Sequence, residues 1–169
     1  DVVQVPPIEF REDYYRGAQD PAFGEWHKLN RHVEEWGPWV HTFAGLVPPD
    51  EHFETHPEWY AEVDGRRISN GQLCLTNEAM YDVLVANLQQ WIEAEPEKQY
   101  WSVSQNDTQG FCTCDRCAAI DAEQEAHSGS LITFINRVAA EFPEQTISTL
   151  AYQYSRKAPR ELRPADNVL

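Results

Sequence analysis

The chain has 169 residues, which is enough for one hydrophobic core and one domain. Its 28 acidic and 13 basic residues give a formal net charge of −15, which argues against a nucleic-acid partner because phosphate binding requires a basic face. No apolar run is long enough to cross a bilayer, and no signal peptide is visible. The chain starts at Asp1 and its last residues resemble the start of a strand, so we expect 1–169 to be one segment of a longer polypeptide.

Extended and helical patterns alternate along the chain. The first half contains two expected strands and two expected helices, in chain order residues 8–11, 21–33, 39–43 and 49–60. Asp64-Gly65 follows, between short extended segments, and is a strong signal for a two-residue hairpin turn.

The second half begins with the clearest helix. Thr76 or Asn77 can cap it, and apolar residues recur at the 3.6-residue period up to Ile92. Pro96 ends it. The remaining expected elements are a strand at 100–104, a helix at 130–142 and a strand at 146–152.

This alternation indicates βαβ units with a parallel sheet. An open doubly wound sheet and part of a (β/α)₈ barrel both fit the pattern. No glycine-rich phosphate turn follows any strand, and the strand-to-helix loops are long and polar. We therefore expect an α/β fold that is a partial (β/α)₈ TIM barrel, since a complete barrel needs about 250 residues.

Asp107 is the main catalytic candidate. It follows the strand expected at 100–104, and barrel enzymes place catalytic groups at the carboxyl ends of strands. Glycosidic cleavage requires a carboxylic acid as proton donor, a role that Asp107 can fill, with Asn106 beside it to bind a sugar hydroxyl. An equally good alternative is that Asn106 and Asp107 merely cap the following turn.

Other polar residues near expected strand ends are candidates for substrate binding. Glu12 or Asp13 could bind substrate or provide a second carboxylate, although a solvated strand end is the simpler interpretation for at least one of them. His41 is expected to point towards the barrel mouth, or else to be a satisfied core histidine. Tyr152 or Tyr154 could reach the same mouth.

Aromatic side chains could add flat walls to such a site. Trp36, Trp39 and Phe111 are candidates for stacking on a sugar ring. Hydrophobic packing is the alternative for each, and we expect it for most of them.

The four cysteines are the sharpest local signal. Cys112, Cys114 and Cys117 lie in six residues after Asp107, and Cys74 precedes a helix of the neighbouring unit. In a parallel sheet these two loops are adjacent, so the four thiolates could hold a structural Zn²⁺. Two disulfides, or one disulfide with free thiols, fit equally well, while a redox pair is the weakest option. No cofactor is required for the proposed catalysis.

Several motifs, in one order, resemble the bacterial family named domain of unknown function 4838. They are residues 36–43, 46–49, 56–60, 72–77, 103–107, the three-cysteine loop and 150–154. The resemblance covers the chain from about residue 8 to its end.

The resemblance implies a glycoside-hydrolase-type TIM barrel, often joined to a domain similar to the amino-terminal part of α-glucuronidases. The present strands would be about the second to the fifth or sixth of eight. Members are exported by polysaccharide-degrading bacteria, which implies a secreted, periplasmic or cell-surface protein. Asn106-Asp107 is similar to the Asn-Glu pair that many glycosidases carry after the fourth strand, with a side chain one methylene shorter.

Two functions therefore stand as expectations. The first is hydrolysis of a glycosidic bond in a complex glycan, with Asp107 as general acid and His41, Asn106, Glu12, Tyr152 and Trp39 at the substrate. The second is a non-catalytic carbohydrate-binding barrel, which would keep the aromatic residues but lack a working acid pair.

Overall fold

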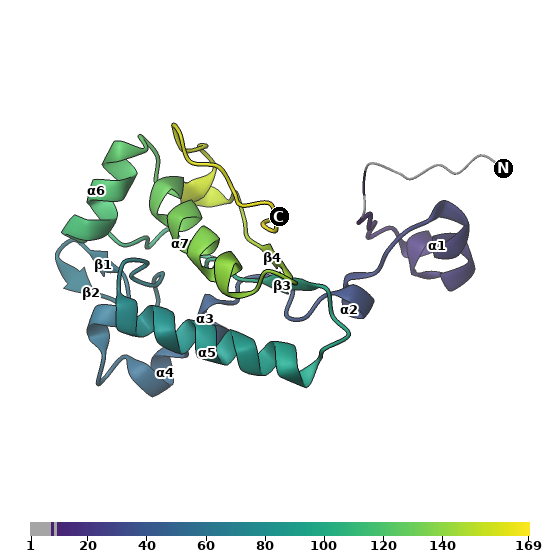
Figure 1. Ribbon diagram of the computed structural model, residues 1–169, viewed down its shortest axis with the longest axis horizontal. Helices are drawn as coiled ribbons and strands as arrows, with labels where there is room; N and C mark the ends of the chain where they lie inside the picture. The colour runs from purple at the N-terminus through teal and green to yellow at the C-terminus, as the bar shows by residue number, and fades with distance from the viewer. Residues whose placement is uncertain (1–7, 9) are drawn as a thin grey trace.

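The computed structural model describes residues 8 and 10–169, which form a mixed α/β structure (Figure 1). Its helices are α1 (Pro21–His27), α2 (His32–Glu35), α3 (Phe43–Leu46), α4 (Pro49–His52), α5 (Glu78–Ala94), α6 (Asp115–Glu123) and α7 (Ser128–Glu141). Short 3-10 turns lie at η1 (Arg16–Gln19), η2 (Pro57–Trp59) and η3 (Gln153–Ser155). The strands are β1 (Glu62–Val63), β2 (Arg66–Arg67), β3 (Tyr100–Ser102) and β4 (Thr146–Ser148).

A short parallel sheet lies at the centre of the molecule. β3 pairs with β4 in parallel, with Trp101 opposite Ile147. Single parallel bridges extend this pair on both sides, from Trp36 to Tyr100 and from Ile147 to Val168. Four chain segments therefore run side by side in the same direction and in chain order, as successive βα units require.

The parallel alternation that the sequence predicted is thus confirmed, but the strands are shorter than expected. Within residues 8 and 10–169 the sheet does not close into a barrel. The part of the chain that the structure describes is accordingly a mixed α/β fragment.

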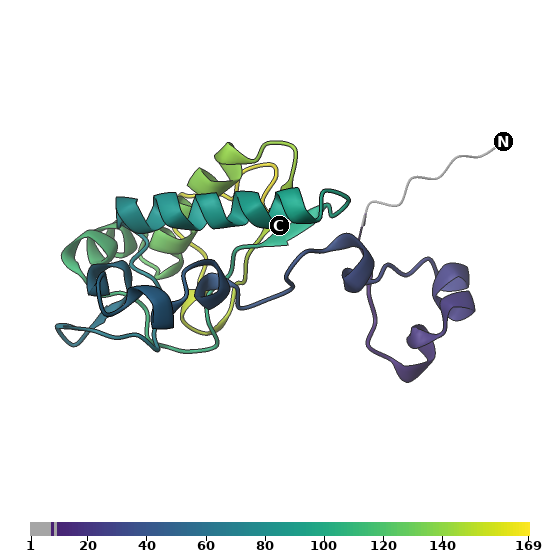
Figure 2. The ribbon, with the colours of Figure 1, turned by 90° about the horizontal axis from the view of Figure 1, so that it is seen from below.

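Two amphipathic helices form the main core with this sheet. Asn77 caps α5 through a bond of 3.0 Å from the Met80 N–H to its side-chain oxygen, as predicted. The buried faces of α5 and α7 pack with β3 and β4 into one hydrophobic cluster, and Figures 1 and 2 show the long α5 beside them. Each fully buried aliphatic side chain contributes about 1.5–3 kcal/mol, so this cluster dominates the stability of the fragment.

The predicted hairpin is also confirmed. β1 and β2 are antiparallel, and Asp64 and Gly65 connect them with φ of 50° and 73°. Positive φ at both central residues is the requirement of a type I′ turn, which favours glycine at the second position.

The prediction of a strand at residues 39–43 is wrong, because the structure has no strand there. Trp36 makes the sheet contact instead, and the chain turns at His41, whose φ is 55°, before entering α3. The hydroxyl of Thr42 takes the place of a strand backbone, because it donates to the Ser102 carbonyl at 2.8 Å and accepts from the Ser104 N–H at 3.0 Å. A side chain therefore satisfies backbone groups that a neighbouring strand would have paired.

Other expected boundaries also differ. Residues 8, 10 and 11 form no strand, and residue 9 lies outside the described residues. The helix expected at 21–33 is split into α1 and α2 because Lys28 adopts a φ of 54°, and the helix expected at 49–60 is reduced to α4 and η2. Helix α6, which contains Cys117, was not predicted.

The amino-terminal segment with η1 and α1 lies apart from the body that contains α5, α6 and α7, and α2 lies between them (Figures 1 and 2). Aromatic rings join the two parts, since Phe10 lies 5.6 Å from Trp36 and 5.5 Å from Tyr100 between ring centroids. Among the described helices, none combines the length and the apolar character needed to span a membrane.

Gly37 offers a direct test of this packing. A Cβ at this position would lie 2.4 Å from the ring of Trp101, which is fully buried. We expect Gly37→Ala to lower the free energy of unfolding by about 1–3 kcal/mol, as overpacking does. Gly17→Ala is the matched control because no atom lies within 4 Å of its added Cβ. Urea unfolding measures both, and equal stabilities of the two variants would contradict the packing described.

Candidate functional site

Asp107 lies on the loop that follows β3, and its carboxylate is held by residues that follow β4. The Tyr152 hydroxyl donates to Asp107 Oδ1 at 3.0 Å, and Gln153 Nε2 donates to the same oxygen at 2.8 Å. The side chain therefore bonds across the ends of two neighbouring parallel strands rather than capping its own turn. Asp107 is exposed, so the carboxylate is accessible to a ligand.

His41 lies beside Tyr152, which bonds this carboxylate. Its ring centroid is 5.8 Å from that of Tyr152, and its Nδ1 lies 2.7 Å from the Gln105 carbonyl oxygen. A carbonyl only accepts, so Nδ1 carries a proton, and Nε2 is an acceptor whenever the ring is neutral. We call His41, Asp107, Tyr152 and Gln153 the Asp107 rim. The structure thus brings together three residues that the sequence singled out.

The backbone of the Asp107 rim is strained. His41 and Gln153 have φ of 55° and 50°, in the left-handed region that non-glycine residues rarely adopt. Such a conformation costs about 1–3 kcal/mol and persists where surrounding contacts over-determine it, as at binding and catalytic sites. The Ser104 hydroxyl, which accepts from the His41 N–H at 2.9 Å, supplies one of these contacts.

The buried side chain of Gln105 supports the Asp107 rim through hydrogen bonds to the turn after β4. Gln105 is fully buried, and its Nε2 donates to Ser155 Oγ at 2.7 Å and to the Tyr152 carbonyl at 3.2 Å. It thereby links the loop that carries Asp107 to the turn that carries Tyr152 and Gln153. Neither Gln105 nor Gln153 was predicted as a site residue, since their roles depend on which strands are neighbours.

Asn106 holds the same loop from the other side. Its Oδ1 accepts from the Ala44 N–H at 3.0 Å, and its Nδ2 donates to the Gly71 carbonyl at 2.9 Å. The buried Gln72 side chain bonds the backbone of Asn106 and Thr108. The Asn106 amide therefore acts on Asp107 by positioning its loop.

Glu12 and Trp39 belong to a second group, in and beside the amino-terminal segment. Glu12 Oε1 accepts from the His32 N–H at 3.1 Å and lies 2.6 Å from His32 Nδ1. The Trp39 ring lies 4.7 Å from the His32 ring and 4.4 Å from that of Trp36, between centroids. The structure therefore joins Glu12 to Trp39 through His32. Within the described residues, neither Glu12 nor Trp39 has a hydrogen bond or ring contact with a residue of the Asp107 rim.

The four cysteines converge, as expected from the prediction that their two loops are neighbours. The sulfur atoms of Cys74, Cys112, Cys114 and Cys117 all lie within 4.8 Å of one another, and all four residues are buried free thiols. Cys74 Sγ and Cys114 Sγ are 3.7 Å apart. Zn–S bonds of 2.3 Å in a tetrahedron place sulfurs about 3.8 Å apart, so these four thiols could bind a metal ion such as zinc.

The surroundings of this cysteine centre contain positive groups that can stabilise a thiolate. Cys114 is the N-cap residue of α6 and Cys117 lies in its first turn, where the helix dipole stabilises negative charge. The Arg67 guanidinium lies 3.7 Å from Cys112 Sγ. Hydrogen bonds from the Cys112 and Cys117 thiols lower the pKa of Cys74 far below its usual range. Hydrogen bonds within the cluster, together with burial, raise the pKa of Cys117 and Cys112, so without a metal ion the cluster favours a single thiolate at Cys74.

The Asp107 loop ends at this cysteine centre. Between Asp107 and Cys112, the Gly110 carbonyl accepts from the Gln72 N–H at 2.8 Å. An added Cβ at Gly71 would lie 2.9 Å from that Gly110 oxygen, so the two loops are in close backbone contact. The loop is therefore anchored at Asn106, at Gly110 and at Cys112.

Comparison with known proteins identifies a family. Neither the curated proteins nor the solved structures contain a match to the chain. A family profile described as a domain of unknown function, DUF4838, matches residues 1–169. The chain therefore belongs to the DUF4838 family over its whole length.

Proposed function

We propose that this chain carries part of a glycan-hydrolysing active site, with Asp107 as the general acid. The observation that carries the proposal is the pair of hydrogen bonds from Tyr152 and Gln153 to one oxygen of Asp107, across the ends of β3 and β4. Carboxylates at this end of parallel strands are typical catalytic groups of barrel enzymes.

The proposed scaffold is a (β/α)₈ barrel to which these residues contribute about the second to the fifth or sixth strand. The parallel order of Trp36, β3, β4 and Val168 supports it, since α5 and α7 connect successive segments. The rest of the barrel would come from other parts of the polypeptide.

The chemistry proposed for Asp107 uses its two oxygens differently. Both protein donors bind Oδ1, and within the described residues no group donates to Oδ2. Oδ2 is therefore the oxygen that would face the leaving sugar and deliver the proton in the proposed reaction. His41 Nε2 and the Tyr152 hydroxyl would bind sugar hydroxyls beside the reacting carbon, and Asn106 would position the loop.

The proposed reaction also requires a second carboxylate. Glu12 and Asp13 are the candidates in this chain, but the Glu12 carboxylate bonds His32 and Tyr14 in the amino-terminal segment. We therefore place this carboxylate among residues outside the chain. Glu12 and Trp39 would then contact a more distant part of the glycan.

Carbohydrate binding without catalysis is the second candidate function. The exposed Asp107 carboxylate, with two donors on one oxygen, is also suited to accept a hydrogen bond from a sugar hydroxyl. Turnover separates the two functions, because a binding protein releases no product.

The test is a screen of the full polypeptide that contains residues 1–169 against a library of neutral, uronic-acid-containing and amino-sugar-containing oligosaccharides. Chromatography of the products detects hydrolysis, and calorimetry detects binding. Hydrolysis supports the first function, and binding without hydrolysis supports the second. The absence of both across the library would contradict the two together.

For the cysteine centre we propose a structural Zn²⁺ held by Cys74, Cys112, Cys114 and Cys117. The distances and burial of the four sulfurs support it, and a four-thiolate site leaves no open position for catalytic water. An exported location, which the family resemblance implies, would instead favour disulfides. Metal analysis under reducing conditions distinguishes them, with about one zinc per chain expected for a four-thiolate site.

A further inference from the structure

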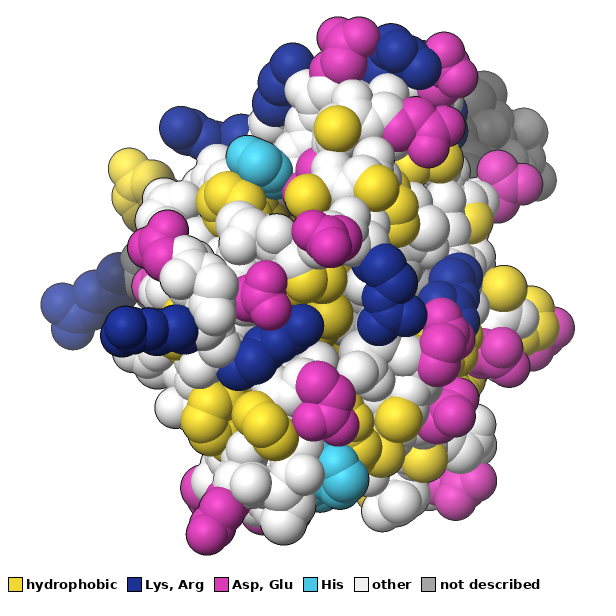
Figure 3. Space-filling view, turned by 90° about the vertical axis from the view of Figure 1, so that its left-hand side faces the viewer, with side chains coloured by type: hydrophobic (Ala, Val, Ile, Leu, Met, Phe, Trp, Pro, Cys, Tyr) yellow, Lys and Arg dark blue, Asp and Glu magenta, His cyan; other side chains and the backbone are white. Residues whose placement is uncertain are grey.

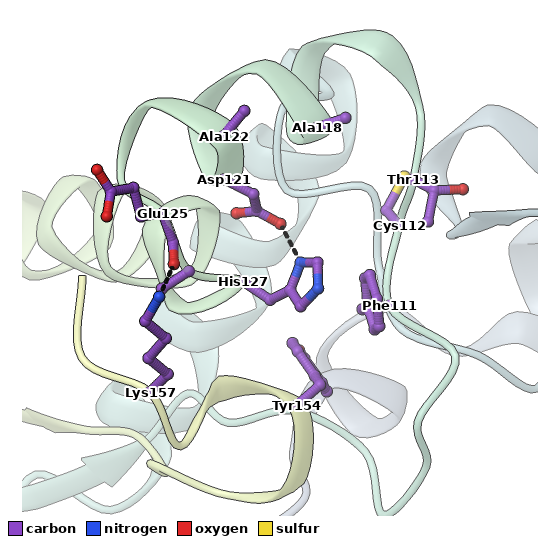
Figure 4. Close-up of a pocket in the computed structure, with 11 residues that line it drawn as sticks. Phe111, Cys112, Thr113, Ala118, Asp121, Ala122, Glu125, His127, Tyr154 and Lys157 are labelled. Atoms are coloured by element: carbon purple, nitrogen blue, oxygen red, sulfur yellow. Dashed lines mark hydrogen bonds and ion pairs between the residues drawn. The ribbon is translucent and has the colours of Figure 1, made fainter. Parts of the chain in front are cut away.

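A cavity of about 430 Å³ opens beside α6, within the size range of small-molecule sites (Figure 4). Phe111, Ala118, Ala122 and Ala126 form much of its apolar wall. His127, which immediately precedes α7, lies at its centre between Asp121 and Phe111. We call it the His127 cavity.

Aromatic rings form one side of the His127 cavity. The centroid of the Phe111 ring lies 4.1 Å from that of His127 and 5.2 Å from that of Tyr154, and the Phe111 and Tyr154 rings are stacked. Flat apolar rings in a cavity suit a ligand with an apolar face, such as the C–H face of a sugar.

A buried carboxylate fixes the orientation of the histidine. Asp121 is 7% exposed; its Oδ1 accepts from the Ser130 N–H at 2.8 Å and its Oδ2 lies 3.1 Å from His127 Nδ1. A carboxylate paired in this way holds a proton on Nδ1 and directs Nε2 away from Asp121, where Nε2 is an acceptor whenever the imidazole is neutral. The His127 side chain is half exposed, and within the described residues Nε2 has no hydrogen-bond partner.

The other charged side chains around the His127 cavity bond within the protein, but of Lys157 and Glu125 only Glu125 has a partner of opposite charge in the part of the chain that the structure describes. Lys157 Nζ donates to the Glu125 backbone carbonyl, and the Glu125 carboxylate lies 3.3 Å from Arg160 Nη1. Asp121 is occupied by His127 and Ser130. The cavity therefore offers aromatic faces, the His127 Nε2 atom and the Lys157 ammonium, groups that can contact the apolar face and the hydroxyls of a pyranose ring.

The His127 cavity adjoins the Asp107 rim through the chain itself. Phe111 lies on the loop that carries Asp107, and Tyr154 directly follows Gln153, which bonds the Asp107 carboxylate. Consecutive Cα atoms are about 3.8 Å apart, so the wall of the cavity begins one residue from the rim.

We propose that the His127 cavity binds a neutral pyranose unit of the glycan, at a position other than the two units joined by the cleaved bond. Phe111 would contact the apolar face of the ring, and His127 Nε2 would accept from a hydroxyl. This inference rests on the proposed function, which it extends by naming a neutral sugar as part of the substrate.

The test measures binding in an Asp107→Asn background of the full polypeptide, so that turnover does not consume the ligand. The probes are cello-, xylo- and manno-oligosaccharides, titrated by calorimetry. Phe111→Ala and His127→Gln are each expected to weaken binding at least about tenfold, which corresponds to about 1.4 kcal/mol. Phe23→Ala, an exposed phenylalanine in α1, is the matched control and should leave the affinity unchanged.

A second measurement does not depend on the variants folding. In the Asp107→Asn protein, the ¹⁵N signals of the His127 imidazole should shift when the oligosaccharide is added, while those of His56, whose side chain is also about half exposed, should not. Affinity unchanged in both cavity variants, with unmoved His127 signals, would overturn the inference even if the wild type hydrolyses a glycan.

The remaining outcomes separate the inference from the proposed function. Weakened binding in the cavity variants, together with undiminished hydrolysis by Asp107→Asn, would support the cavity and contradict the role of Asp107. Hydrolysis of only charged glycans, with no binding of these neutral probes, would overturn the cavity and leave the Asp107 chemistry standing.

Discussion

Asp107→Asn in the full polypeptide is expected to lower kcat/KM on the cognate glycan by about 10²–10⁴-fold, the contribution typical of a general acid. The amide has nearly the same shape, and its Oδ1 can still accept from Tyr152 and Gln153. It carries no acidic proton, so the step that protonates the leaving oxygen is lost while the rim remains in place. Steady-state kinetics with the glycan identified by the library screen measures the effect.

The leaving group distinguishes an acid from a residue that only binds substrate. An aryl glycoside with an acidic phenol departs without protonation, so Asp107→Asn should slow its cleavage far less than cleavage of the natural linkage. Asp64→Asn is the matched control, because Asp64 lies in the β1–β2 turn, where asparagine is equally suited. Equal losses on both substrates would argue for binding, and unchanged turnover of the natural glycan would remove Asp107 from the chemistry.

Cys117→Ser is expected to produce the largest loss of stability. The substitution leaves three thiolates for the metal, and the loss of a structural metal belongs to the small class of changes that cost more than about 4 kcal/mol. Zinc content should fall with the free energy of unfolding, because metal binding to such a site is part of the folding free energy. Metal analysis and chemical unfolding of the purified variant measure the two quantities.

Arg116→Gln is the matched control for the cysteine variant. Arg116 is exposed and lies between Cys114 and Cys117 in the first turn of α6, so its replacement should leave the zinc content unchanged. Denaturing mass spectrometry without reductant provides the opposing test. Four free thiols per chain fit the metal, whereas a mass lower by the hydrogens lost in two disulfides would contradict it.

The effect of zinc should extend to the Asp107 rim. The loop between Asp107 and Cys112 is anchored at the cysteine centre and by the Gly110 bond to Gln72. Loss of one anchor should therefore lower turnover as well as stability. This coupling explains physically why a structural metal would lie on the loop that displays the candidate acid.

Local sequence determined the elements that depend only on their own residues. The 3.6-residue period and the Asn77 cap determined α5, the apolar face of residues 131–138 determined α7, and Asp64-Gly65 determined the hairpin. The convergence of the cysteines was also predictable, because loops at the same edge of a parallel sheet are neighbours.

Only the tertiary structure decided the parts that depend on contacts between distant segments. The Thr42 hydroxyl replaces backbone pairing with β3, so the β-forming residues 39–43 form no strand. Gln153 bonds Asp107, and Asp121 orients His127. Both contacts depend on turns, and the geometry of these turns cannot be predicted from a repeating pattern in the sequence. Side-chain hydrogen bonds between loops depend on how those loops are placed in space, and that placement follows from packing of the whole core rather than from any local pattern.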